Sequence, residues 1–380
     1  MNIKGLLLGS AAAMVAVSGA RAADAVVIAE PEPMEYVRIC DTYGVGFYYI
    51  PGTETCLKVS GYVRYDIGVG YNGLTDIRDK EDGDLNDTYF KRARFQLRVD
   101  SRAETELGTL RTYAAINFNY DTNGNYYSSS VPLVTDSSDY VGIEHAYIEL
   151  GGFRVGKTDS LFSTFTGYAS GVANDGIVPY GPFGTHQIAY TFNGGNGFSA
   201  AVALETGDGN GSLNSSDPNI YSIDSYVPHV VGGVGYTGGW GGVSLVAGYD
   251  SVWEEVAVKG RVDFNIGDAL SAFVMAGWAS KDEDIVRNMT TGPNYYGQWG
   301  GDWALWVGGA WKFNEKTTLN VEVGYDDADN FSTVVGLDYY LVNNFLIKPE
   351  VVYYDNFDDD MGYDGDNWGG FLRFQANFGG

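Results

Sequence analysis

The segment Trp368-Gly-Gly-Phe-Leu-Arg-Phe-Gln-Ala-Asn-Phe378 alternates between two kinds of side chain. Counting every second residue from Trp368, one face is apolar and ends in aromatic residues, whereas the other face carries Arg373, Gln375 and Asn377. A strand with an apolar, aromatic-tipped face and a mostly polar reverse face is typical of β-barrels that cross a membrane. Because the chain repeats this pattern from end to end, we predict an all-β fold: a 16-stranded antiparallel transmembrane β-barrel.

Residues 1–22 have the features of a secretory signal peptide. Lys4 supplies a positive charge, residues 6–17 form a short apolar run, and Ala20-Arg21-Ala22 offers small residues for cleavage. This run is too short and wrongly flanked for a spanning helix, and no later stretch reaches the about 18 apolar residues that such a helix needs. An exported chain with many amphipathic strands indicates the outer membrane of a Gram-negative cell. An uncleaved N-terminal membrane anchor is the alternative interpretation.

The composition is acidic and rich in aromatic residues. The 23 Lys+Arg and 49 Asp+Glu residues give a net charge of −26, and loss of Lys4 and Arg21 with the signal peptide changes it to −28. This balance argues against nucleic-acid binding, which needs basic patches for the phosphates. The 29 Tyr, 19 Phe and 8 Trp residues suit aromatic girdles at the two membrane interfaces. Acidic clusters at 76–87, 326–329 and 358–360 fall in expected loops facing the lipopolysaccharide.

Sixteen segments show strand periodicity after an N-terminal periplasmic segment, residues 23–56, and together they form a barrel domain over residues 57–378. The expected strands are 57–69, 92–99, 110–120, 139–150, 152–157, 185–194, 197–206, 227–238, 241–250, 254–267, 270–280, 300–314, 317–326, 330–342, 345–357 and 366–378. An even number lets the last strand pair with the first, which removes the free edges. Short Gly- and Asn-containing turns alternate with long loops, so the short turns are expected in the periplasm and the long loops outside.

Arginines recur on the polar face of the second expected strand, at Arg92, Arg94 and Arg98. Alternate residues of a strand lie about 7 Å apart. An arginine facing lipid near the midplane would cost roughly 2–4 kcal/mol, so these side chains are expected to face the lumen. Arg64 on the first strand and Arg111 on the third are expected to join them. The alternative is a network that only neutralises buried charges.

Residues 157–184 form a long insertion between two strands and contain Asp159 and Asp175. Long loops in compact architectures are usually functional. Folded into the lumen, this loop would place its acids opposite the arginines and narrow the pore, and the resulting field would select solutes by charge and dipole. An ordinary surface loop is the alternative.

The mixed charges of Lys259, Arg261 and Asp263 on a later strand are interpreted as an ordinary water-facing wall. The pore constriction is thus predicted from these side chains: Arg64, Arg92, Arg94, Arg98, Arg111, Asp159 and Asp175.

Cys40 and Cys56 are the two cysteines of the chain. In an exported protein they are expected to form a disulfide, which would contribute about 3 kcal/mol in the loop-entropy account. Two free thiols are the alternative, and a metal site is disfavoured because no histidine lies nearby to complete the ligands.

No enzyme signature is present, and no cofactor is expected. His145, His186 and His229 are widely separated, and neither HExxH nor GxSxG occurs.

Three rival functions are also compatible with the sequence. One is a substrate-specific channel for sugars or anions, which an aromatic track starting at Tyr62 and Tyr113 would favour. The second is a barrel enzyme that assembles its triad from distant strands, and the third is a closed structural or adhesive barrel.

Several stretches resemble the alphaproteobacterial general porins over nearly the whole chain. They include Ala22-Ala-Asp-Ala25, Glu35-Tyr-Val-Arg-Ile-Cys-Asp41, Tyr49-Ile-Pro-Gly-Thr-Glu-Thr-Cys56, Gly61-Tyr-Val-Arg-Tyr-Asp66, Thr105-Glu-Leu-Gly-Thr109, Gly194-Gly-Asn-Gly-Phe-Ser199, Tyr295-Tyr-Gly-Gln-Trp-Gly-Gly-Asp-Trp303 and Trp368-Gly-Gly370. The resemblance implies a 16-stranded homotrimer in the lipid and lipopolysaccharide of the outer membrane. It also implies a third loop that folds inward, with Phe165-Thr-Gly-Tyr168 as part of it, and supports the Cys40–Cys56 pair. Chains of this kind typically end on the terminal aromatic residue, whereas here Gly379-Gly380 follow Phe378.

We therefore expect an outer-membrane porin that passes small hydrophilic solutes and ions by diffusion. The acidic loops at the openings of the pore (the mouths) favour cations. The arginines at its narrowest part (the waist) favour anions. Since mouth charges dominate for small ions at low salt, where screening is weak, a weak cation preference is expected.

Overall fold

The computed structural model describes residues 38–71, 74–79, 81–123, 136–207, 220–281, 293–357 and 367–379. Within these ranges the chain is all-β apart from a 3-10 turn, η1 (Asp41–Tyr43), and a short helix, α2 (Leu161–Thr166). None of the described helices is long and apolar enough to cross a membrane. The expected signal peptide and the acidic residues 358–360 lie outside the described ranges.

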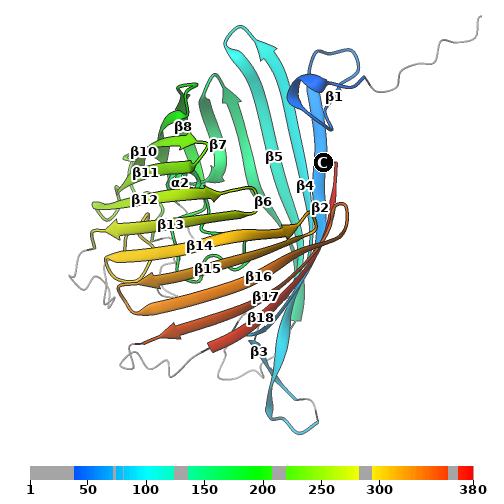
Figure 1. Cartoon of the computed structure of the whole chain (residues 1–380), viewed down its shortest axis with the longest axis vertical. Helices are drawn as coiled ribbons and strands as arrows, with labels where there is room; N and C mark the ends of the chain where they lie inside the picture. Colours follow the sequence, from blue (N-terminus) through cyan, green and yellow to red (C-terminus); the bar gives the residue numbers. More distant parts are fainter. Residues whose placement is uncertain are drawn as a thin grey trace, which may run out of the picture. The chain divides into compact units, whose positions relative to one another are not determined.

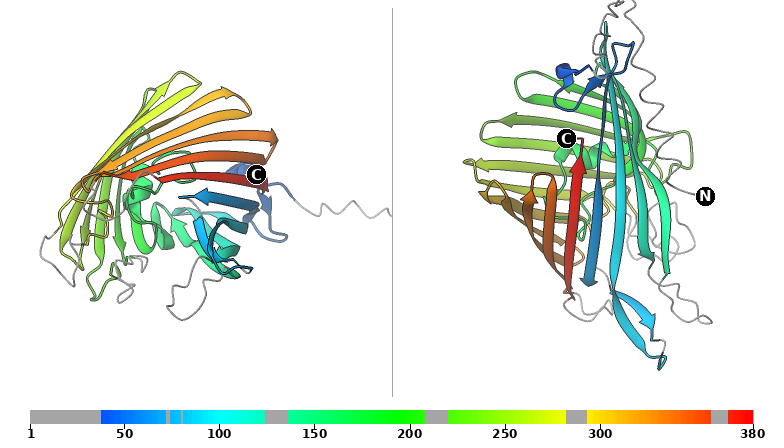
Figure 2. Two further views of the ribbon diagram at one scale, coloured as in Figure 1. Left: turned by 90° about the horizontal axis from the view of Figure 1, so that it is seen from below. Right: turned by 90° about the vertical axis from the view of Figure 1, so that its right-hand side faces the viewer.

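Sixteen strands of the described residues form one closed antiparallel barrel (Figures 1 and 2). They are β2 (Cys56–Gly70), β4 (Leu85–Thr105), β5 (Gly108–Asn123), β6 (Asp136–Leu150), β7 (Phe153–Asp159), β8 (Gly184–Asn193), β9 (Phe198–Glu205), β10 (His229–Gly238), β11 (Gly241–Asp250), β12 (Glu255–Ile266), β13 (Leu270–Ala279), β14 (Trp303–Asn314), β15 (Thr317–Asp326), β16 (Asn330–Val342), β17 (Phe345–Asn356) and β18 (Asn367–Phe378). Each strand pairs with the next along the barrel, and β18 pairs with β2 from Gly369↔Gly70 to Phe378↔Gly61. The predicted 16-stranded barrel is confirmed.

The two faces of the strands differ as the alternating sequence predicts. In β4, for example, Phe95 is 39% exposed and its neighbour Gln96 only 5%, because one points away from the barrel and the other into it. Large aromatic side chains are exposed near both ends of the strands. Those near the short turns include Phe153, Phe192, Phe198, Trp240, Trp311 and Phe313, and those near the opposite end include Tyr249, Trp278, Trp303 and Trp368. Two aromatic bands around an apolar belt are what a membrane-spanning barrel needs.

The strand expected at residues 92–99 is much longer than the apolar alternation indicated. It runs from Leu85 to Thr105, and its first part pairs with an additional short strand, β3 (Leu74–Arg78). This hairpin lies within the expected loop 71–87 and projects beyond the neighbouring strands (Figure 1). The alternation of apolar and polar residues is required only where one face meets lipid, so the extension could not be predicted from it.

The connections alternate in length as predicted. Short turns such as residues 106–107, 151–152, 239–240, 315–316 and 343–344 join strands at one end of the barrel, where β2 begins and β18 ends. The longer connections lie at the other end. Short turns face the periplasm in barrels of the outer-membrane type, so the periplasmic side remains predicted at this end.

A small disulfide-closed loop covers the start of β2. Cys40 and Cys56 are bonded, with Cα atoms 6.0 Å apart, so the predicted disulfide is confirmed. The loop is attached to the barrel through Lys58, which donates to the Val45 carbonyl (3.0 Å), and through Tyr43, which donates to Glu104 (2.6 Å). Gly379 packs against the same region. Its φ is +70°, and a Cβ there would lie 2.2 Å from the Val59 carbonyl oxygen, so this position requires glycine.

Replacing both cysteines by serine is expected to lower the free energy of unfolding by about 3 kcal/mol, because the open chain gains the entropy that the bridge removes. Conductance should stay at the wild-type level, since none of residues 40–56 lines the cavity described below that is enclosed by β2 and β4 to β7. The temperature at which the unboiled barrel loses its compact gel mobility would measure the first effect. An unchanged temperature would contradict it.

The connection between β7 and β8, residues 160–183, lies inside the barrel and is called the inward loop below. Figure 2 shows its helix, α2, on the inner side of the sheet. Phe162 and Val178 of this loop are buried in a cluster with lumen-facing residues of the wall, such as Met275 and Trp306. The expected inward-folded third loop is therefore present, and it divides the lumen into a packed side and an open side.

Candidate functional site: the cavity beside the inward loop

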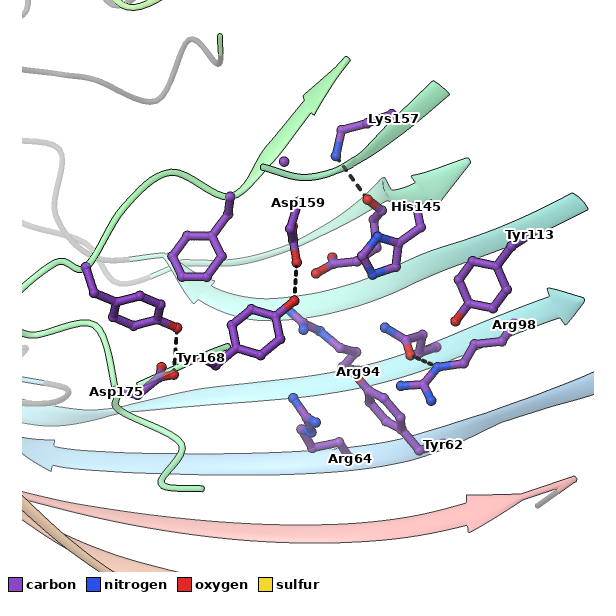
Figure 3. A pocket seen from close by; sticks show the side chains of 15 residues that line it. Tyr62, Arg64, Arg94, Arg98, Tyr113, His145, Lys157, Asp159, Tyr168 and Asp175 are labelled. Atoms are coloured by element: carbon purple, nitrogen blue, oxygen red, sulfur yellow. Dashed lines mark hydrogen bonds between the residues drawn. The ribbon is translucent and has the colours of Figure 1, made fainter. Parts of the chain in front are cut away.

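A cavity of about 520 Å³ lies between the inward loop and the strands β2, β4, β5, β6 and β7. Figure 3 shows Arg64, Arg94 and Arg98 on the wall formed by β2 and β4, and Asp159 and Asp175 away from them, with Lys157 and His145 beside Asp159. The lining residues are Tyr62, Arg64, Arg94, Gln96, Arg98, Tyr113, Glu144, His145, Lys157, Asp159, Tyr168, Asp175, Tyr180, Phe183 and Gly184. The structure thus places five of the seven residues predicted for the constriction around one cavity.

The three arginines of this cavity are held by uncharged amides. Arg64 donates from Nε to Gln375 (2.8 Å), Arg94 donates to Asn119 (2.6 Å), and Arg98 donates to Gln96. Among the described residues, none of the three forms an ion pair with a carboxylate. Their positive charges are therefore fixed in place and not neutralised by the protein.

Arg92 and Arg111, which were also predicted for the constriction, do not line this cavity. Arg92 forms an ion pair with Asp121 (2.7 Å), and Arg111 forms ion pairs with Asp100 (2.9 Å) and Glu149 (2.8 Å). Arg111 lines a separate cavity of about 380 Å³ close to the short turns. The sequence showed that these arginines face inward, but it did not show that neighbouring strands supply carboxylates to them.

Carboxylates on the opposite side are likewise bonded to uncharged donors. Tyr168 donates its hydroxyl proton to Asp159 (2.7 Å), and Tyr180 donates to Asp175 (2.8 Å). Burial raises the pKa of Asp175 to about 6, against the opposing effect of the hydrogen bond from Tyr180. Because no ion pair crosses the cavity among the described residues, the opposite charges stay separated across the open space.

The barrel wall holds the inward loop through its backbone carbonyls. Arg261 donates to the Tyr168 carbonyl (2.5 Å), Lys259 to Tyr180 (2.5 Å), Trp306 to Val178 (2.9 Å) and Lys348 to Gly171 (2.5 Å). These donors come from β12, β14 and β17. The interpretation of Lys259 and Arg261 as a water-facing wall is wrong, since Lys259 is completely buried and both side chains bind the loop.

Glu205 at the end of β9 fixes the start of α2. Its carboxylate is completely buried and accepts hydrogen bonds from Ser160 Oγ (2.7 Å) and from the Leu161 backbone N–H (2.8 Å). Tyr296 donates a third, longer bond to the same carboxylate (3.3 Å). A helix begins with N–H groups that lack partners within the helix, and here a single wall residue satisfies one of them.

A second segment inside the barrel, residues 293–302 before β14, packs against α2. The Tyr296 ring lies 5.1 Å from that of Phe162, and Trp299 lies 6.5 Å from Phe162 and 5.6 Å from Trp306. Tyr295, Tyr296 and Trp299 are essentially fully buried. The stretch Tyr295–Trp303, noted above for its resemblance to porins, therefore packs against the element that shapes the cavity.

Glycines of the wall make room for these rings. A Cβ at Gly233 would lie 2.5 Å from the Phe165 ring, one at Gly248 would lie 2.4 Å from Tyr296, and one at Gly277 would lie 2.7 Å from Trp299. Real Cβ atoms do not approach so closely, so these positions exclude larger residues while the rings stay in place.

Gly233→Ala is expected to displace Phe165 and shift the inward loop, which changes single-channel conductance by tens of per cent. Gly232→Ala on the neighbouring position is the matched control, because its Cβ would meet nothing closer than 3.5 Å. Conductance in planar bilayers measures the difference. Equal conductance of the two variants would contradict the packing role of Gly233.

Comparison with known proteins agrees with this architecture. Residues 24–379 match the Porin subfamily. The chain is 46% identical to porin Omp2a of Brucella melitensis over 389 residues and to porin Omp2b of Brucella neotomae over 381 residues, with 100% of each chain covered in both cases.

Solved structures share the fold at low identity. The outer membrane channel DcaP of Acinetobacter baumannii has a TM-score of 0.59 at 18% identity, covering 87% of this chain and 99% of that one. A triple mutant of the Rhodopseudomonas blastica porin has a TM-score of 0.51 at 12% identity, covering 85% and 100%.

The closed barrel with its aromatic bands, the lumen narrowed by an inward loop and the match over almost the full length lead to one conclusion. The chain is an outer-membrane β-barrel channel and belongs to the Porin subfamily.

Proposed function

We propose that the cavity beside the inward loop is the constriction through which small hydrophilic solutes and ions diffuse. The observation that carries this proposal is the separation of charge across it. Arg64, Arg94 and Arg98 are bonded to amides on one wall, whereas Asp159 and Asp175 are bonded to tyrosines on the other. Fixed charges of opposite sign produce a transverse field that orients charged and dipolar solutes.

The acidic mouths set the preference for small ions in this proposal. Without residues 1–22, which contain Lys4 and Arg21 and no acid, the net charge changes from −26 to −28. Screening is weak at low salt, so the acidic loops at the openings of the pore then attract small cations most strongly and produce a weak net cation preference. The arginines at the waist reduce this preference, because they favour anions that pass close to them.

The functional unit is proposed to be a homotrimer in outer-membrane lipid and lipopolysaccharide, as family membership supports. Reconstitution of the unboiled protein in a planar bilayer with a salt gradient tests both parts. Openings in groups of three with a small reversal potential are expected. Single openings would contradict the trimer, and silence from verified folded barrels would contradict the diffusion pore.

Acidification should make the channel less cation-selective, because Asp175 loses its negative charge as the pH falls through about 6. The charged groups that act most directly on Asp175 are Glu350 and Lys348. His145 lines the same cavity and gains a positive charge on acidification, which has the same sign of effect. Reversal potentials at several pH values, measured for wild type, Asp175→Asn and His145→Gln, separate the two contributions. A wild-type pH profile in the Asp175→Asn variant would contradict the role of Asp175.

A further inference from the structure

Two arginines of the constriction share one aromatic ring. The guanidinium carbon of Arg64 lies 4.3 Å from the centre of the Tyr62 ring, and that of Arg98 lies 5.5 Å from the same centre. Arg94 is the direct cross-strand partner of Arg64. Three like charges are therefore gathered at one place on the wall, around a tyrosine that is only 4% exposed.

This cluster differs from the other arginines that line the lumen. Arg92, Arg102, Arg111, Arg154, Arg261 and Arg373 each form an ion pair with a carboxylate. Among the described residues, the three arginines of the cluster donate hydrogen bonds only to side-chain amides, and the nearby Lys157 donates to the Glu144 backbone carbonyl rather than to its carboxylate. Like charges at short range raise the energy of the empty site, and a bound anion lowers it.

The amide bonds also orient the cluster. In each arginine Nε is occupied by Gln375, Asn119 or Gln96, which leaves the terminal nitrogens for other acceptors. A guanidinium can bind a carboxylate through two parallel hydrogen bonds. Arg64 and Arg98, placed around one ring, thus offer two separate carboxylate positions beside a cavity of about 520 Å³.

We propose that Arg64, Arg94 and Arg98 form a binding site for small organic dianions, with short dicarboxylates as the chemical class. The inference rests on the proposed function, since it assigns a solute class to the same constriction. A dicarboxylate satisfies two guanidiniums at once, whereas a monoanion satisfies one. A zwitterion gains less, because the three carboxylates that line the cavity, Asp159, Asp175 and Glu144, already accept hydrogen bonds from Tyr168, Tyr180 and Asn117.

Three four-carbon solutes of similar length test the proposal in planar bilayers: succinate as dianion, 4-aminobutyrate as zwitterion and succinamide as neutral control. Each is added at increasing concentration to a constant chloride background, and single-channel current and its noise are recorded. We expect succinate to reduce the current saturably, with excess noise from binding and release. The other two should produce at least tenfold weaker effects.

The variants Arg64→Gln and Arg98→Gln should each raise the half-saturating succinate concentration about tenfold, the effect expected from losing a charge-assisted pair of hydrogen bonds of about 1.4 kcal/mol. Arg154→Gln is the matched control, because Arg154 lines the other cavity and pairs with Glu149. It should leave the succinate effect unchanged.

The outcomes separate this inference from the proposed function. A channel that conducts normally but shows no saturable succinate effect overturns the dianion site and leaves the pore intact. Equal effects of succinate and 4-aminobutyrate overturn it in favour of zwitterion binding. Equal succinate effects in wild type and in both arginine variants place any binding elsewhere in the lumen. Failure of the pore itself would appear as absent chloride conductance before any solute is added.

Discussion

Replacing Arg64, Arg94 and Arg98 together by glutamine is expected to raise the cation-to-anion permeability ratio about tenfold. A unit charge about 7 Å from a passing ion contributes roughly 0.6 kcal/mol in water. Three such charges contribute about 2 kcal/mol, of which screening at 0.1 M salt, with a Debye length of about 10 Å, removes a substantial part. Without the three charges, the electrostatic energy of a cation at the constriction falls and that of an anion rises. Both changes increase the cation-to-anion permeability ratio.

The measurement is the reversal potential of the triple variant in a tenfold salt gradient. Glutamine is shorter than arginine but keeps an uncharged hydrogen-bond donor, and the amide partners remain available, so the barrel should fold. The Arg92→Gln variant is the matched control, because Arg92 is paired with Asp121 outside the cavity. A triple variant whose reversal potential equals that of wild type would show that the waist does not control selectivity.

Glu205→Ala is expected to loosen the inward loop and to produce the second large effect. The substitution leaves Ser160 Oγ and the Leu161 N–H without their buried acceptor, and each unsatisfied group costs about 1–3 kcal/mol. The start of α2 then loses its attachment to β9, whereas the barrel strands keep their ladders. We expect larger conductance fluctuations, closure at lower voltage and a changed size limit for permeating polymers.

Glu315→Ala is the control for this variant, since Glu315 lies exposed in the short turn between β14 and β15. Glu205→Gln should be intermediate, because its amide keeps one acceptor oxygen. Single-channel traces at increasing voltage and the exclusion of polyethylene glycols of graded size give the readout. Quiet wild-type traces from Glu205→Ala would contradict the anchoring role.

Strands were predictable from the sequence because lipid and water impose opposite requirements on alternate residues. The alternation in Trp368–Phe378 is found in β18, whereas the outer part of β4 beyond the membrane carried no such signal. The inward position of Arg64, Arg94 and Arg98 was predictable for the same reason.

The detailed environment of lumen residues was not predictable. Arg92 and Arg94 lie two residues apart on one face, yet Arg92 meets Asp121 and Arg94 meets Asn119, as cross-strand register determines. Lys259 was interpreted as part of a water-facing wall, and no sequence pattern singled out Glu205. Their burial depends on where the inward loop lies, and this path is set by contacts between segments far apart in the chain.

Blocking the constriction covalently tests the central claim most directly. An Arg98→Cys variant, reconstituted in a planar bilayer and treated with a bulky charged methanethiosulfonate reagent, should lose a large fraction of its current. Phe95→Cys, on the outward face of the same strand, should be unaffected. The native disulfide leaves no free cysteine to react. Full current after verified modification of Arg98→Cys would contradict a pore that passes between the arginine cluster and the inward loop.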